Sequence, residues 1–249
     1  TETPFGTEKM PENLFWWLKD YDEQITDAAK SGQKATGEVA QQWKELASGN
    51  TSKAHSEVIV EPLIQTKWNQ GSPYNIHCPG SNSTGCVATA MAQIMKYWEY
   101  PTTGFGSHSY TPATHPGYEE QTANFGETTY DWANMTNTYS STSPNEEKEA
   151  VAKLMYHCGI SVNMDYGSNG TSSSATTSDV VDALQSYFNY SQTAQYISQD
   201  EIVDATGQED LGQWKNMLKA ELTARRPIQY RGRKRIDEEH TSGHSFICD

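Results

Sequence analysis

The chain has 249 residues, which is enough for one sizeable hydrophobic core and an attached segment. It carries 32 acidic and 18 basic side chains, and the resulting net charge of −14 opposes binding to nucleic acid or to anionic membranes. No stretch has the composition of a transmembrane span, and four cysteines are too few and too scattered for a disulfide scaffold. The composition predicts a folded protein with a polar surface and at least one free thiol.

The first part of the chain predicts a helical extension. Apolar residues recur at helical spacing from Leu14 to Ala28, and a shorter pattern of the same kind runs from Val39 to Ala47. Residues 48–57 are small and polar, the composition of an exposed linker in which proteolytic nicking concentrates. We therefore expect residues 1–57 to be a separate segment and residues 58–249 to form the main domain.

A buried helix is predicted in the stretch from Thr84 to Trp98. Its apolar stripe is formed by Val87, Ala90, Met91, Ile94, Met95 and Trp98. Thr84 is placed to cap the helix, and Pro101 lies beyond its end. Cys86 falls in the first turn, where unpaired amides and the helix dipole stabilise a thiolate. Cys86 is thus a candidate nucleophile, although an inert buried cysteine fits the same pattern.

The rest of the chain mixes helices and strands. Helices are expected at 146–158, 179–188 and 211–222, and paired strands at 227–230 and 245–248. Residues 101–130 predict turns with short strands, and residues 167–177 predict a long loop of functional length. A basic run at 231–235 fits either a solvated hairpin tip or a surface that steers substrate toward His244. The fold class is therefore α+β.

Four motifs occur in a fixed order along residues 58–249. They are NQGSPYN at 69–75, GCVATAMAQIMKYWEYP at 85–101, GISVNMDYG at 159–167 and GHSFICD at 243–249. Together they resemble the streptopain and interpain family of secreted bacterial cysteine peptidases. The resemblance implies a papain-like fold, in which a helical subdomain carries the nucleophile helix and a second subdomain is an antiparallel sheet.

The same resemblance assigns roles to single residues. Cys86 matches the family's nucleophile, and His244 matches its histidine, which spacing alone does not select from the seven histidines of the chain. Gln70 matches a glutamine whose side chain joins the Cys86 amide in the oxyanion hole; unaided, a loop glutamine is usually a surface residue. No cofactor is implied. A metal site is not expected either, because His77, Cys78 and Cys86 lack a second Cys/His pair at zinc spacing.

The resemblance also bears on the state of the protein. It implies a secreted, extracellular enzyme that acts on proteins and peptides and is made as a zymogen. Residues 1–57 then correspond to the tail of an inhibitory propeptide, which is itself a partner of the mature domain. In the family a C-terminal segment with a histidine-orienting asparagine follows the histidine strand, so we expect Asp249 to mark a truncation. The alternative hypothesis is a catalytically silent, secreted protein-binding or adhesion module with this fold.

Overall fold

The computed structural model describes residues 22, 25–27, 29–32, 34, 37–48, 60–112, 114, 117–167, 173–235 and 241–249. The chain divides into two units, residues 1–58 and residues 59–249. In the first unit, residues 25–27 and 29–30 are helical, and α2 spans Gly37–Ala47. The expected linker at 48–57 lies outside the described residues apart from Ser48.

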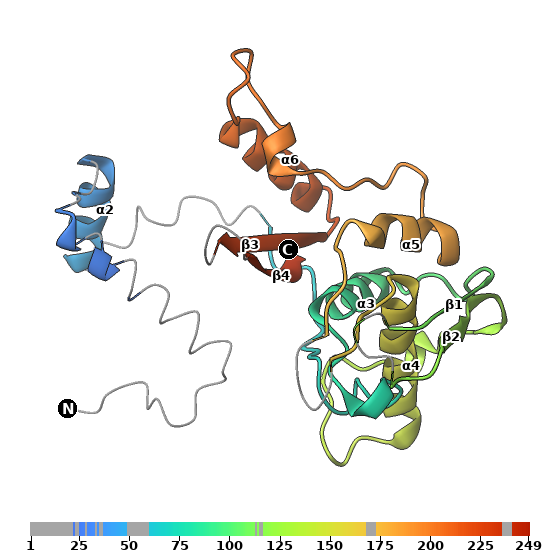
Figure 1. Cartoon of the computed structure of the whole chain (residues 1–249). Coiled ribbons are helices and arrows are strands. Elements are labelled where there is room, and N and C mark those ends of the chain that lie inside the picture. The colour runs from blue at the N-terminus through green and yellow to red at the C-terminus, as the bar shows by residue number, and fades with distance from the viewer. Residues whose placement is uncertain are drawn as a thin grey trace. The chain divides into compact units, whose positions relative to one another are not determined.

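Helix α3 (Cys86–Trp98) is the centre of the second unit (Figure 1). The predicted helix is confirmed, although it begins one residue later than a cap at Thr84 implies, and Val87, Ala90, Met91 and Met95 are buried as the spacing required. Trp98 departs from the prediction because it is 47% exposed at the end of the helix. Burial of large apolar side chains contributes about 1.5–3 kcal/mol each, so this stripe anchors the helix in the core.

The predicted cap of α3 is wrong. The residue before the helix is Gly85, and no side chain caps the helix. The Thr84 hydroxyl is instead engaged with the hydroxyl of Thr89 at 2.8 Å. Gly85 has φ of 84°, and a Cβ there would lie 2.5 Å from Met164 Sδ. Only glycine combines this backbone conformation with such a close approach, so Gly85 fixes where the helix begins.

Helix α4 (Asn145–Ser161) packs along α3 (Figure 1). It is three residues longer than predicted at its C-terminal end, and its buried face includes Val151, Leu154, Met155, Cys158 and Ile160. Two further helices, α5 (Asp179–Tyr187) and α6 (Leu211–Thr223), agree with the predicted ranges. Short 3-10 turns occur at Pro79–Ser81, Phe125–Glu127, Trp132–Asn134 and Gln199–Glu201.

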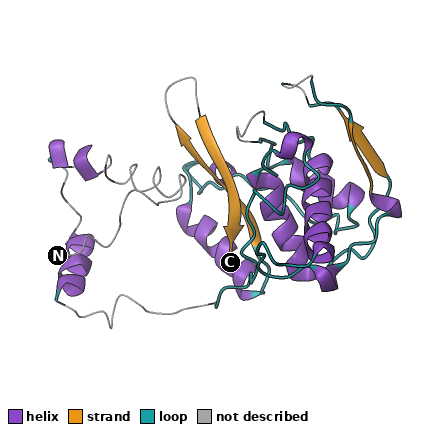
Figure 2. Ribbon diagram, turned by 90° about the horizontal axis from the view of Figure 1, so that it is seen from below, coloured by secondary structure: helices purple, strands orange, loops and turns teal. Residues whose placement is uncertain are grey.

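Two antiparallel hairpins lie on opposite sides of α3 and α4 (Figure 2). In the first, β1 (Ser107–Tyr110) pairs with β2 (Gln121–Asn124) and contacts α4. In the second, β3 (Ile228–Arg235) pairs with β4 (Thr241–Cys248) and contacts α3. The basic run at 231–235 therefore belongs to a strand and not to a hairpin tip, because the strand pairing continues to Arg235 opposite Thr241.

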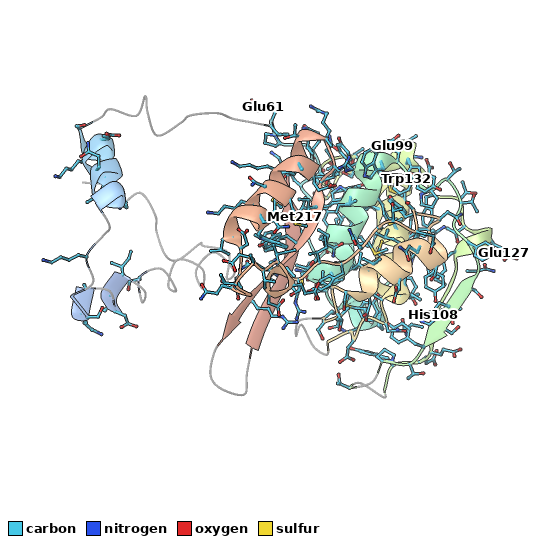
Figure 3. All side chains as sticks on the ribbon, turned by 90° about the horizontal axis from the view of Figure 1, so that it is seen from above. Glu61, Glu99, His108, Glu127, Trp132 and Met217 are labelled. Atoms are coloured by element: carbon cyan, nitrogen blue, oxygen red, sulfur yellow. The ribbon has the colours of Figure 1, made fainter. Side chains whose placement is uncertain are left out.

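The C-terminal end of α3 is held by one lysine. Lys96 Nζ donates to the Trp132 carbonyl at 2.8 Å and to Glu99 Oε1 at 2.6 Å. Figure 3 labels Glu99 and Trp132, which lie close together in that view. The positive charge also suits the negative end of the helix dipole. Within the described ranges, no helix is both long and apolar enough to cross a membrane.

Candidate active site

The N-terminus of α3 meets strand β4 at Cys86. The backbone N–H of Ser245 donates a hydrogen bond to Cys86 Sγ at 3.4 Å. Gln229 on β3 links the helix to the second strand of the hairpin. Its Nε2 donates to the carbonyl of Val87, the next residue of the helix, at 3.1 Å and to Ser245 Oγ at 3.0 Å. These contacts place the thiol between the positive end of a helix and an N–H group of a strand.

His244 forms the second half of the site. Its side chain hydrogen-bonds Cys86, and this bond raises the pKa of His244 against the lowering effect of burial. Burial raises the pKa of the Cys86 thiol, but the His244 hydrogen bond, the N–H groups of Ser245 and Val87 and the histidine charge together lower it below its usual value. The arrangement favours a thiolate beside an imidazolium.

The other three cysteines have the opposite electrostatics. All four cysteines are free thiols. Burial raises the pKa of Cys78 to about 12 and raises the pKa of the fully buried Cys158 further. Burial also raises the pKa of Cys248, with an added contribution from the charge of Asp249. Cys86 is thus the one cysteine that the fold activates.

The other described histidines have different partners. His77 pairs with Glu149 at 2.9 Å, and His108 hydrogen-bonds Asn163 at 2.7 Å. His157 is buried against the Tyr130 hydroxyl at 2.9 Å, and burial lowers its pKa to about 4. His55, His115 and His240 lie outside the described residues. Among the described histidines, His244 is the one that hydrogen-bonds Cys86.

The loop that carries Gln70 lies against the same helix end. The backbone N–H of Thr84 donates to the Gln70 carbonyl at 3.0 Å. Since Thr84 precedes Cys86 by two residues, this bond ties the main chain of Gln70 to the approach to α3. The structure therefore places the main chain of Gln70 beside the segment that leads to Cys86.

Sequence reasoning missed two residues of this region. Gln229 bridges the helix and the strand. In the sequence it is the one amide side chain in the apolar run before the basic cluster, and this is the feature that could have indicated its role. Phe246 stacks on the ring of His244, with centroids 6.4 Å apart and planes 19° apart. It also contacts Tyr230 across the hairpin, at 5.4 Å between centroids. Strand alternation places His244 and Phe246 on one face.

In the part of the chain that the structure describes, no group of three or more His, Cys, Asp or Glu side chains is arranged to hold a metal ion. A nucleophilic thiol with a histidine partner is the arrangement that the described residues provide.

Known proteins share this sequence and fold. Streptopain of Streptococcus pyogenes is 32% identical over 261 residues, covering 96% of this chain, so the chain spans 58% of that relative's length. The thiol protease/hemagglutinin PrtT of Porphyromonas gingivalis is 31% identical over 255 residues, which is 98% of this chain and 27% of PrtT.

Two solved structures of a Prevotella intermedia protein are also similar. Active wild-type interpain A cysteine protease is 38% identical, with a TM-score of 0.68, and covers 76% of this chain and 75% of its own. A prointerpain A fragment is 35% identical, with a TM-score of 0.70, and covers 96% of this chain and 70% of its own. Residues 68–249, most of the chain, match the sequence profile of the Peptidase C10 family. With its papain-like fold, this chain belongs to the Peptidase C10 family of cysteine peptidases.

Proposed function

We propose that this protein is a secreted cysteine endopeptidase, in which Cys86 is the nucleophile and His244 its partner. The observation that carries the proposal is the lowered pKa of Cys86 at the start of α3, where His244 and the Ser245 N–H both bond the thiol. A catalytically silent module has no need for one activated thiol among four. The family membership supports the same chemistry.

The reaction follows from these positions. The Cys86 thiolate attacks the peptide carbonyl carbon, and His244 gives its proton to the departing amine, which leaves a thioester on Cys86. Water then attacks the thioester while His244 accepts a proton from it, and the sulfur leaves as the carboxylic acid is released, which restores the thiolate beside the protonated His244. Both steps need a histidine that holds a proton at one stage and accepts one at the next.

The developing oxyanion needs hydrogen-bond donors. The first intrahelical bond of α3 runs from the Thr89 N–H to the Gly85 carbonyl, so the amides of Cys86, Val87 and Ala88 precede the helical ladder. The Val87 amide faces the thiol, which leaves the Cys86 amide for the oxyanion. We assign the second donor to the Gln70 side chain, whose main chain is bonded two residues before Cys86.

Residues 1–57 are proposed to be the remnant of an inhibitory propeptide, and residues 58–249 the peptidase domain. The prointerpain A fragment covers 96% of this chain, whereas active interpain A covers 76%. The additional coverage by the precursor supports an N-terminal segment that is absent from the active form. The proposed partners are therefore protein and peptide substrates and the segment itself.

The first prediction concerns the nucleophile. A peptidyl epoxide directed at cysteine peptidases is expected to modify one site per chain in the wild type and in Cys248→Ser, and none in Cys86→Ala. Hydrolysis of a protein substrate should disappear only in Cys86→Ala. Intact-mass spectrometry and a gel assay measure both results. Labelling that persists in Cys86→Ala would refute the assignment, and a folded wild type without labelling or hydrolysis would support a binding module.

The second prediction concerns pH. His244→Ala removes the group that most strongly lowers the pKa of Cys86, so that pKa should rise and the thiolate should form only at higher pH. Below the pKa, each unit of rise reduces the alkylation rate about tenfold. The measurement is the rate of iodoacetamide modification between pH 4 and pH 10. His108→Ala is the control and should leave the pH profile of alkylation unchanged. An unchanged pH profile in His244→Ala would show that His244 is not the partner of Cys86.

The third prediction concerns the oxyanion hole. Gln70→Ala should lower kcat by about 10²–10³-fold, because the donor acts on charge that develops only in the transition state. The rate of Cys86 alkylation should not change. Gln65→Ala, at an exposed glutamine five residues earlier, should retain full turnover. A rise in KM at constant kcat would show that Gln70 binds substrate and does not stabilise the oxyanion.

The fourth prediction concerns residues 1–57. Peptidase activity should appear only after cleavage in the linker before Val58, and a peptide of residues 1–57 added in trans should inhibit the cleaved enzyme. A control peptide with Leu14, Trp17 and Leu18 replaced by Ser should inhibit poorly, because it lacks the apolar face predicted to bind. Equal activity of cut and uncut protein would exclude an inhibitory role.

A further inference from the structure

Six of the 18 basic residues of this acidic chain lie between Arg225 and Arg235. They do not share one environment. Arg226 is bound to the Glu221 carboxylate through two hydrogen bonds, of 2.6 and 2.7 Å. Arg231 is half-buried on β3, and within the described residues it forms no ion pair. A half-buried guanidinium with unused donors is a binding group for an anion.

The Arg231 guanidinium lies over Gly243, the residue before His244. A Cβ at Gly243 would lie 3.3 Å from Arg231 Nε and 3.4 Å from Arg231 Nη2. Arg231 is paired with Ser245 across the hairpin, so its side chain shares a face with those of Gly243 and Ser245. Because Gly243 has no side chain, the guanidinium of Arg231 can lie against the strand at this position.

That place is close to the thiol. Gly243 is two residues from Ser245, whose N–H contacts Cys86 Sγ. A strand advances about 3.3 Å per residue, which puts the guanidinium roughly 7–10 Å from the thiol. An extended peptide covers that distance in about two or three residues. A substrate bound across Cys86 therefore presents a side chain within reach of Arg231.

We propose that Arg231 is a specificity-determining residue, which selects an acidic side chain two or three residues from the scissile bond of the substrate. The inference rests on the proposed endopeptidase function and adds a substrate class to it. A carboxylate at that position can accept two hydrogen bonds from the planar guanidinium. A lysine in place of Arg231 would supply the positive charge but not this two-donor geometry.

The test uses pairs of fluorogenic peptides that differ only by Glu or Gln, at each position two and three residues from the cleaved bond. After activation, the full chain should cleave one Glu peptide with a kcat/KM about 5–20-fold higher than that of the matching Gln peptide. This ratio lies between the contribution typical of an exposed ion pair and that of a hydrogen bond to a charged group. Added salt should reduce the ratio. Arg231→Gln should bring the ratio to about one, and Arg231→Glu should favour a Lys peptide at the same position.

The control is Arg225→Gln, which makes the same change in charge outside the hairpin and should keep the preference. Equal cleavage of every Glu and Gln pair by the wild type would overturn the proposal while leaving the endopeptidase function intact. An equal loss of both peptides in Arg231→Gln would show a structural role and would also overturn it. A chain that cleaves no peptide and does not react with the epoxide refutes the endopeptidase function itself.

Discussion

The contact between the start of α3 and strand β4 is the interaction on which the site depends. Two residues separated by 159 positions meet in the hydrogen bond from Ser245 N–H to Cys86 Sγ. Gln229 adds a bridge from its side chain to both elements, across 142 positions to Val87. Neither element forms a site alone, because the helix supplies the thiol and the hairpin supplies the imidazole and an N–H donor. The pKa of the Cys86 thiol therefore depends directly on how the hairpin packs against the helix.

Other contacts keep the helix start in position. Gly85 allows the chain to turn beneath Met164, and Thr84 binds the main chain of Gln70. The loop after Tyr166 returns to the same place, where Ser173 Oγ donates to the Ser83 carbonyl at 2.6 Å. Segments from three parts of the sequence thus converge on the four residues before α3.

The apolar spacing of the sequence predicted the positions of the helices, but it did not predict which residues contact one another across elements. The bounds of α3 follow from apolar spacing, since one buried face requires that period. The Thr84 cap was wrong because the residue before the helix adopts a φ of 84°, which favours glycine, where the chain passes beneath Met164; this conformation leaves no local signal apart from the glycine itself. Trp98 is exposed because the stripe runs past the end of the packed neighbours. The basic run became strand because pairing with β4 outweighed its loop-like composition.

The site was predictable in part for a different reason. Helix position alone made Cys86 a candidate, but the choice of His244 and Gln70 came from resemblance to a family. Spacing contains no information on which distant residue packs against a helix start. Gln229 and Phe246 escaped both arguments, since an amide and an aromatic ring in a strand have many ordinary uses. Their role becomes visible only when the hairpin register is known.

The unequal thiols have a consequence for redox chemistry. Oxidants react with thiolates, so peroxide should attack Cys86 first and form a sulfenic acid there. Cys78 and Cys158 are buried with raised pKa values and make poor resolving partners. Cys248 is three residues beyond Ser245, about 10 Å along the strand and too far for a disulfide without backbone movement. Recovery of an oxidised Cys86 therefore depends on a reductant supplied by the surroundings, and the redox potential there sets what fraction of the protein carries a reactive thiol.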